Sequence, residues 1–165
     1  MQLDITSILS VQGNSLPVSG KILLDSVIFC GTEFGFGEEA EISGTIVNNS
    51  GVFVLNADVK GKVTVNCARC GKPTEAEFSF ELNEKLIKQG SPCTDEEATL
   101  FEGSVIDVKE LVLNGFLMNT PTRYLCKEDC KGICPICGTN RNEKECGCEE
   151  QVTDPRLDIL NNIKF

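Results

Sequence analysis

The stretch FVLNADVKGKVTVNCARCGKPTEAEFSFEL, which covers residues 53–82, decides the fold. Between Phe53 and Cys67 every odd position is apolar or small, and the even positions from Asn56 to Asn66 are all polar. After Pro73 the alternation resumes with apolar side chains at even positions. A period of two is typical of a strand with one buried face. Two such runs around a short turn predict a β-hairpin, with Cys67 and Cys70 forming a knuckle at its tip.

The sequence around this hairpin predicts a largely β body from residue 1 to about 100. Gly61, inside the first run, is expected to mark a bend or a bulge. The segment Gly31–Ala40 is rich in glycine and glutamate and is expected to be a loop. Residues 89–98 form a polar break after the strands.

From Asp107 onward the apolar spacing becomes helical. One helical face carries the apolar side chains Val108, Leu111, Val112, Phe116 and Leu117. Asp107 is the expected N-cap, Glu110 stands three residues later as in a capping box, and Pro121 ends the helix. A second short helix is expected at Asp154–Leu160, with Pro155 at its first position.

The 165-residue chain has a net charge of −10, from 25 acidic and 15 basic residues. That charge argues against a bare nucleic-acid binder, which needs a basic surface. Residues 121–148 hold five basic and four acidic residues, so the acidic excess lies elsewhere and suits a basic partner, or simply keeps the protein in solution. No apolar run approaches the roughly 20 residues of a membrane span, and residues 1–10 lack signal-peptide features. We therefore expect a cytoplasmic protein without a membrane partner.

The ten cysteines carry the chemistry of this chain, which has no histidine. Eight of them fall into four close pairs: Cys67 and Cys70, Cys126 and Cys130, Cys134 and Cys137, and Cys146 and Cys148. A tight turn between two cysteines directs both sulfurs at one zinc ion, at about 2.3 Å. The knuckle Cys-Pro-Ile-Cys-Gly at residues 134–138 pairs naturally with Cys146 and Cys148, which gives one Cys₄ site.

The remaining two pairs predict a second Cys₄ site from Cys67, Cys70, Cys126 and Cys130, which would clip the hairpin tip to the C-terminal part. Alternatively, Cys126 and Cys130 compete for the C-terminal ion, so one or two zinc ions are expected. Cys30 and Cys93 are interpreted as ordinary thiols. The predicted fold is therefore α+β, with a mainly antiparallel β body, a few short helices and a zinc-ribbon-like module. The body covers residues 1–120, with a helix near 107–118. Residues 121–165 form the zinc module and a C-terminal helix, packed on the hairpin.

Three other uses of the cysteines compete with zinc. A disulfide framework fits the even count but not the expected reducing compartment. A thioredoxin-like pair at Cys67 and Cys70 needs a strand-to-helix junction, whereas the sequence predicts a strand-to-strand turn. An iron–sulfur cluster also uses four cysteines, but the Cys-Pro-x-Cys-Gly knuckle favours zinc.

No catalytic constellation is evident. The usual general base is missing without histidine, and a zinc ion held by four cysteines has no open position for water. We therefore expect no enzyme activity and no small-molecule substrate. Arg69 and Arg141, which lie within the cysteine segments, are candidates for contact with a partner, although each is equally well explained as a solvated side chain.

Three segments together resemble one family: Cys67-x-Arg69-Cys70, the run from Cys130 to Asn140, and Asp154-Pro155-Arg156. They are similar to the YceD family, the large ribosomal RNA subunit accumulation proteins. The resemblance implies a role in accumulation of large-subunit (23S) rRNA, with an rRNA precursor or a basic ribosomal protein as partner, and it implies no catalysis.

These observations give one leading hypothesis and two rivals. The leading hypothesis is a non-enzymatic ribosome biogenesis factor whose zinc module presents a near-neutral to weakly basic face to RNA, while its acidic body holds a basic ribosomal protein. The first rival is a redox or metal-sensing protein with labile cysteine pairs. The second is a structural scaffold in which metal serves folding alone.

Overall fold

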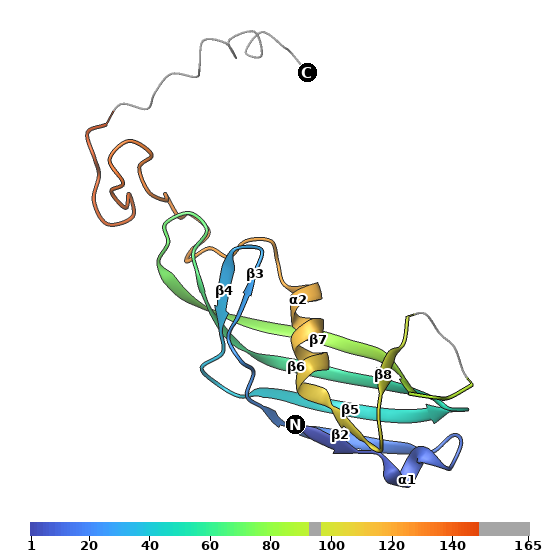
Figure 1. The fold of residues 1–165 in the computed structure, drawn as a ribbon. Coiled ribbons are helices and arrows are strands. Elements are labelled where there is room, and N and C mark those ends of the chain that lie inside the picture. The colour runs from blue at the N-terminus through green and yellow to red at the C-terminus, as the bar shows by residue number, and fades with distance from the viewer. Residues whose placement is uncertain (93–96, 149–165) are drawn as a thin grey trace, which may run out of the picture.

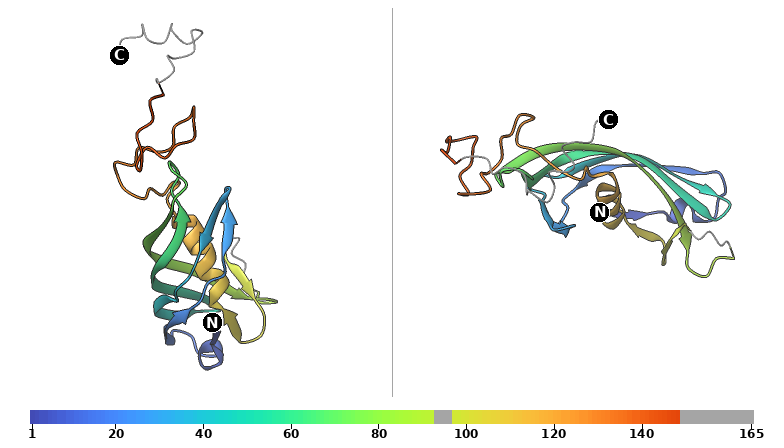
Figure 2. Two further views of the ribbon diagram at one scale, coloured as in Figure 1. Left: turned by 90° about the vertical axis from the view of Figure 1, so that its left-hand side faces the viewer. Right: turned by 90° about the horizontal axis from the view of Figure 1, so that it is seen from above.

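The body is a curved β-sheet, and the helices lie on one face of it (Figures 1 and 2). The computed structural model describes residues 1–92 and 97–148. Four antiparallel strands make the main sheet in the order β2 (Ser15–Ile22), β5 (Ala40–Asn49), β6 (Val52–Asn66) and β7 (Pro73–Lys88). A strand β8 (Thr99–Phe101) is added parallel to the end of β7, and β1 (Gln2–Asp4) pairs with β9 (Val105–Asp107) away from the sheet. The short α1 (Thr6–Leu9) and α2 (Val108–Asn119) complete an α+β fold, as the sequence predicts.

The predicted hairpin is the β6–β7 pair, which runs in one unbroken register from Val52 opposite Ile87 to Asn66 opposite Pro73. Gly61 lies opposite Phe78 within this register, so β6 has no bulge there, and the alternative expectation of a bend stays a prediction. Glycine is needed there for a different reason. A Cβ atom at position 61 would lie 2.6 Å from the Phe78 ring, far inside van der Waals contact.

The segment expected to be a loop at Gly31–Ala40 contains a strand, and this prediction is corrected. Residues Thr32–Gly35 form β4, which pairs with β3 (Val27–Phe29) and with the far end of β6. Cys30 and Gly31 form the turn between β3 and β4, both with positive φ, as a two-residue hairpin turn requires. The glycines hide an alternation in which Phe34 and Phe36 point into the core. One edge of β6 is therefore shared by β5 and β4.

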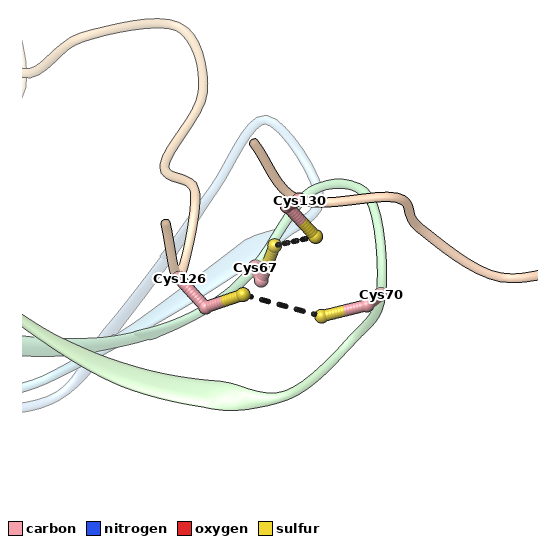
Figure 3. A group of neighbouring side chains, drawn as sticks. All are labelled: Cys67, Cys70, Cys126 and Cys130. Carbon is pink, nitrogen blue, oxygen red and sulfur yellow. Dashed lines mark hydrogen bonds between the residues drawn. The ribbon is translucent and has the colours of Figure 1, made fainter. Parts of the chain in front are cut away.

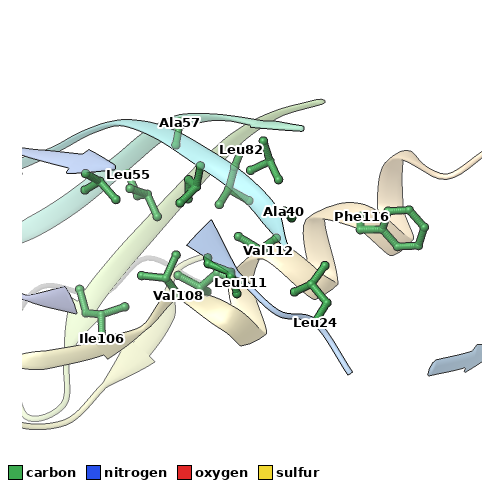
Figure 4. Close-up of a cluster of buried hydrophobic side chains, with 14 of the residues drawn as sticks. Leu24, Ala40, Leu55, Ala57, Leu82, Ile106, Val108, Leu111, Val112 and Phe116 are labelled. Atoms are coloured by element: carbon green, nitrogen blue, oxygen red, sulfur yellow. The ribbon is translucent and has the colours of Figure 1, made fainter. Parts of the chain in front are cut away.

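The core lies between the sheet and α2 (Figure 4). From β6, Leu55, Val59 and Val63 are at most 1% exposed, because alternate side chains of a strand point to the same face. Phe116 of α2 stands at the centre of an aromatic cluster. Its ring centroid lies 5.4 Å from that of Phe34, 5.1 Å from that of Phe36 and 4.9 Å from that of Phe78.

The helix α2 begins where the sequence places its N-cap. The Asp107 carboxylate accepts a hydrogen bond from the Lys109 N–H at 3.0 Å, and Pro121 follows the C-cap Thr120. No helix among residues 1–92 and 97–148 is long and apolar enough to cross a membrane. The helix expected at Asp154–Leu160 lies outside the described residues, and the division at residue 120 stays a prediction.

Candidate metal centres

A tight knuckle turns the chain at the hairpin tip. The Gly71 N–H donates to the Cys67 carbonyl at 2.9 Å, and the Cys67 N–H donates to the Lys72 carbonyl at 2.9 Å. Gly71 has a φ of +70°, a conformation that glycine adopts without steric cost. The turn brings the backbone N–H groups of Arg69 and Cys70 to the Cys67 sulfur.

A second knuckle has the same construction. The Gly138 N–H donates to the Cys134 carbonyl at 2.9 Å, and Gly138 has a φ of +73°. The Cys134 N–H donates to the Thr139 carbonyl at 2.8 Å, next to an isolated bridge between Ile133 and Asn140. Each knuckle follows from its sequence, because glycine four residues after the first cysteine permits the left-handed backbone that closes the turn.

Tyr124 holds the segment that carries Cys126 and Cys130 beside the hairpin tip. Its carbonyl accepts a hydrogen bond from the Ala68 N–H at 2.9 Å, and its hydroxyl lies 2.8 Å from that of Thr120. Its ring packs against Phe34 with centroids 6.0 Å apart, which connects the tip to the aromatic cluster. The chain that leaves α2 is therefore fixed beside the knuckle just before it reaches Cys126.

The structure gathers Cys67, Cys70, Cys126 and Cys130 into one group, termed the hairpin group (Figure 3). The Sγ atoms of Cys67 and Cys130 are 3.8 Å apart, and those of Cys70 and Cys126 are 3.6 Å apart. All four sulfurs lie within 4.8 Å of one another. Cys67 and Cys130 are buried, and the other two are half-buried.

Cys134, Cys137, Cys146 and Cys148 form the second group, termed the C-terminal group. Their sulfurs also lie within 4.8 Å of one another. This group is more open, since Cys134 is buried, Cys137 is exposed and the other two are half-buried. The two groups are those that the sequence predicts, and Cys126 and Cys130 lie with the hairpin cysteines rather than with the C-terminal ones.

The sulfur spacing fits a metal ion. Four thiolates at about 2.3 Å from a tetrahedral ion stand about 3.8 Å from one another. The separations of 3.8 and 3.6 Å match this arrangement. A disulfide needs about 2.05 Å between the sulfurs, so these pairs are not disulfides. Each group can therefore hold a metal ion.

In the hairpin group, backbone groups and burial act on the thiols in opposite directions. Burial raises the pKa of Cys67, but N–H groups of Cys126, Cys70 and Arg69 outweigh it and lower that pKa to about 6. Burial, with the neighbouring thiols, raises the pKa of Cys126 to about 12. One sulfur is therefore stabilised as a thiolate, while full ionisation of the group requires a cation.

The C-terminal group repeats this division. N–H groups of Cys137 and Ile136 lower the pKa of Cys134 to about 6, against the effect of burial. The neighbouring Cys137 thiol, with burial, raises the pKa of Cys148 to about 12. Metal binding releases the protons that such thiols hold, so both groups are expected to bind metal more tightly as pH rises.

A family model described as "Large ribosomal RNA subunit accumulation protein YceD" matches residues 55–164, a range that includes all eight grouped cysteines. This chain belongs to the YceD family. The family that its cysteine motifs resemble is thus the one whose model matches residues 55–164. Its name connects members of the family with large-subunit rRNA.

Curated relatives of this YceD family member come from a plant and from mycobacteria. It is 23% identical over 158 residues to a protein of Arabidopsis thaliana described as "Large ribosomal RNA subunit accumulation protein YCED homolog 1, chloroplastic", a match to 78% of this chain and 49% of the relative. It is 28% identical over 113 residues to an uncharacterized protein of Mycobacterium tuberculosis, a match to 66% of this chain and 53% of that protein. The chain spans about half the length of the curated relatives it matches. No solved structure gives a significant match.

The two arginines predicted to contact a partner also make contacts within this YceD family member. Arg69 donates from its guanidinium to the Cys130 carbonyl at 2.9 Å. The Arg141 guanidinium lies 3.8 Å from the Cys134 sulfur. Both side chains thus hold the cysteine segments together, and their role toward a partner stays a prediction.

Asn142 is the residue of this site that sequence reasoning missed. Its side-chain N–H donates to the Cys130 sulfur at 3.3 Å, while its oxygen accepts from the Lys131 N–H at 2.9 Å. Its position between Cys137 and Cys146 was the available signal, since an amide in such a loop is a common donor to a thiolate. Of the two thiols outside the groups, Cys30 is exposed in the β3–β4 turn and Cys93 lies outside the described residues.

Proposed function

We propose that this protein is a non-enzymatic ribosome biogenesis factor that supports accumulation of 23S rRNA, and that two structural zinc ions hold its cysteine end. Membership of the YceD family carries the ribosomal part of the proposal. The two four-sulfur groups carry the metal part. Because the chain covers about half of its curated relatives, the name of the Arabidopsis relative supports this role without fixing a mechanism.

The geometry favours single zinc ions over iron–sulfur clusters. A cluster core is much larger than one ion and holds its cysteine sulfurs further apart. Sulfurs that all lie within 4.8 Å of one another surround only one ion. All-thiolate ligation and the two glycine-closed knuckles are typical of structural zinc in a zinc-ribbon-like module. With four protein ligands the ion would have no open position for water, which supports the absence of catalysis.

Filling the sites would change the charge of the cysteine end. Four thiolates around one Zn²⁺ carry a net charge of about −2. Residues 121–148 have one more basic than acidic residue, so one filled site outweighs that excess. Between the two partner classes, a basic ribosomal protein therefore suits the molecule better than naked rRNA. A cytoplasmic location accords with this role.

Sedimentation of the tagged full-length protein tests the proposal. In a sucrose gradient of lysate we expect the protein in fractions with large-subunit precursors, or with a free basic ribosomal protein. A Cys67→Ser, Cys130→Ser variant serves as the matched comparison, because it lacks the hairpin group alone. A protein that associates with neither contradicts the ribosomal role. Full 23S rRNA maturation in cells without the gene would contradict the ribosomal role and favour the scaffold hypothesis.

One observation favours the redox or metal-sensing alternative. Cys137 is exposed, and the hydroxyl of Thr139 holds the pKa of its thiol below the ordinary value. Cys67, by contrast, is only 3% exposed and is a poor target for a reagent. Alkylation of the zinc-loaded protein separates the two functions. Rapid loss of zinc through Cys137 modification supports sensing, whereas protection of all eight cysteines supports a structural role.

A further inference from the structure

The two cysteine groups are joined by a short stretch of backbone. Cys130 belongs to the hairpin group, and Cys134 begins the C-terminal knuckle only four residues later. Between them, Gly132 packs against Arg69, whose carbonyl accepts a hydrogen bond from the Ile133 N–H at 3.2 Å. The base of the C-terminal knuckle is thus fixed to the hairpin tip.

Asn142 makes a second connection, from the opposite direction. It lies in the loop between Cys137 and Cys146, whose ends are held when the C-terminal group binds metal. From this loop it donates to the Cys130 sulfur at 3.3 Å and accepts from the Lys131 N–H at 2.9 Å. The Asn140 side chain orients it, accepting from the Asn142 amide at 2.9 Å and from its backbone N–H at 3.0 Å.

We infer that Asn142 is a positioning residue that couples the two groups, so that metal binding in the C-terminal group raises the metal affinity of the hairpin group. The inference rests on the metal binding proposed above. A metal ion in the C-terminal group holds both ends of the loop, which presents the amide of Asn142 to the Cys130 thiolate. Groups that hydrogen-bond metal ligands commonly change metal affinity 10- to 100-fold. Coupling is reciprocal, so the hairpin group favours filling of the C-terminal group by the same factor.

A double-mutant cycle in the full chain tests this coupling. Alkylation of individual cysteines at set free Zn²⁺ concentrations, read by peptide mass spectrometry, gives the Zn²⁺ affinity of each group separately. We expect Asn142→Ala to lower the affinity of the hairpin group about tenfold or more. Removing the C-terminal group by Cys134→Ser and Cys137→Ser is expected to cause a similar loss, and Asn142→Ala then adds nothing further.

Lys144→Gln is the matched control, since Lys144 is an exposed residue of the same loop, and we expect it to change neither affinity. The coupling is overturned if the Zn²⁺ affinity of the hairpin group is unchanged in Asn142→Ala. It is also overturned if the losses caused by Asn142→Ala and by removal of the C-terminal group multiply when the two changes are combined. In either case zinc-dependent protection of all eight cysteines in the wild type keeps the proposed metal sites. Absence of that protection removes the metal proposal itself.

A second inference concerns the outer edge of β7. Among the described residues, β8 covers this edge only at Leu86–Lys88, which leaves residues 73–85 without a neighbouring strand. The Cys67 N–H donates to the Lys72 carbonyl, so Lys72 is hydrogen-bonded to the β6 side of the hairpin. Hydrogen-bonded residues alternate along an antiparallel pair of strands, so even-numbered β7 residues bond to β6. The backbone N–H and C=O groups of odd-numbered β7 residues therefore point away from β6, toward the open edge. The Gln89 N–H, which donates to the Phe101 carbonyl of β8 at 2.9 Å, follows the same alternation.

This edge lacks one usual protection against strand addition. The outer strand β2 carries Pro17 in its middle, whereas β7 has proline only at its first residue. Its stretch 73–85 holds four glutamates, Glu75, Glu77, Glu81 and Glu84, against one lysine, Lys85. Lys62 and Lys60 of β6 lie opposite Glu77 and Ser79 and offset part of that charge. The acidic excess nevertheless lies on the edge strand itself.

The structure assigns the β7 edge as a docking site for an extended basic peptide segment that adds to the sheet as a further strand. Backbone hydrogen bonds supply the attachment in this mode, and alternate side chains select the sequence. The partner class agrees with the basic protein proposed above and rests on that proposal. The stretch 73–85 is long enough for two strands of ordinary length, since strands average 5–6 residues.

Fluorescence anisotropy of the zinc-loaded full chain with a labelled Lys–Val alternating peptide of about 12 residues tests the assignment. We expect a peptide N-methylated at alternate residues, which keeps its charge but cannot pair, to bind at least tenfold more weakly. We expect Ser79→Pro, which removes one outward N–H, to weaken binding of the unmodified peptide while the thermal melt shows a folded protein.

Charge is tested with two matched triple variants. Glu75→Gln, Glu77→Gln and Glu81→Gln together are expected to weaken binding. Glu38→Gln, Glu39→Gln and Glu41→Gln remove the same charge from β5 and the residues just before it, rather than from β7, and are expected to weaken binding less. Equal binding of the methylated and unmethylated peptides overturns strand addition, as does the absence of binding. Either result leaves the sedimentation test of the ribosomal role unaffected.

Discussion

The sheet body and the cysteine end are stabilised by different means. The body buries a continuous set of apolar side chains from the sheet, α1 and α2, whereas in the described residues 121–148 the buried positions are Cys130, Gly132 and Cys134. A segment with almost no apolar burial cannot offset its conformational entropy by the hydrophobic effect. One chain thus has two sources of stability, apolar burial and thiolate chemistry, which meet at the hairpin tip.

Metal removal is expected to have the largest effect and to separate the two regions most clearly. A structural zinc site contributes about 10–16 kcal/mol of binding free energy, which the cysteine end loses on chelation. We expect residues 121–148 to become accessible to protease while the sheet keeps its circular dichroism. Re-addition of zinc is the control and restores protection. Loss of the sheet signal on chelation would contradict independent stabilisation.

Two cysteine substitutions sharpen the comparison at the point where the regions meet. Cys67→Ser is expected to lower the zinc content from two ions to one and to release the segment that follows α2, because the hairpin group fixes it to the sheet. Cys148→Ser is expected to cost one ion as well but to leave that segment docked. Protease cleavage between residues 119 and 126 distinguishes the two variants, and equal cleavage in both would show that the hairpin group is not the clip.

A core substitution tests the body from the other side. Phe116→Ala removes the centre of the aromatic cluster and is expected to lower the free energy of unfolding by about 3–5 kcal/mol. Zinc content should stay the same. Met118→Ala is the control on the same helix, since Met118 is 86% exposed, and its effect is expected within about 0.5 kcal/mol. Urea unfolding measures both, and a zinc loss in the Phe116 variant would show that the regions are coupled.

The smallest effect is expected at the N-cap of α2. Asp107→Ala removes the acceptor of the Lys109 N–H and is expected to cost about 1 kcal/mol of body stability, with no change in zinc affinity. Asp107→Asn retains an acceptor and should recover most of that loss. Thermal melts of the three proteins measure the difference. An alanine variant as stable as the wild type would contradict the role of the cap.

Local patterns were readable from the sequence because their physics is local. The β6–β7 hairpin follows from its alternation, and both knuckles follow from cysteine pairs with a glycine behind them. The strand β4 was not predicted, because glycines and glutamates surround Phe34 and Phe36. The alternation of buried and exposed positions is therefore hard to recognise in a segment whose composition is typical of a loop. The prediction of a bulge at Gly61 was wrong because glycine is required there by the Phe78 ring on the neighbouring strand, which leaves no room for a Cβ atom. Contacts of this kind depend on the fold and leave no signal in a short window.

The two cysteine groups show the same limit. The C-terminal group comes from one short segment, and its membership is evident from spacing. The hairpin group contains residues about 60 positions apart in the sequence. It could be predicted only by pairing the two cysteine pairs that remained after the C-terminal group was assigned. Asn142 was missed because its hydrogen bond to Cys130 depends on the way the two groups stack.

The length of β6 has a mechanical consequence. Its 15 residues span about 50 Å at 3.3 Å per residue, whereas the 12 residues of α2 cover about 18 Å. The hairpin therefore projects beyond the helix that braces it, and Figure 1 shows the cysteine end at its far tip. Beyond its pairing with β5, residues 61–66 of β6 span about 20 Å, so a rotation of about 10° at Gly61 displaces the tip by about 3.5 Å. A partner that binds the sheet and rotates the hairpin would therefore also move the metal-bound end and any molecule in contact with it.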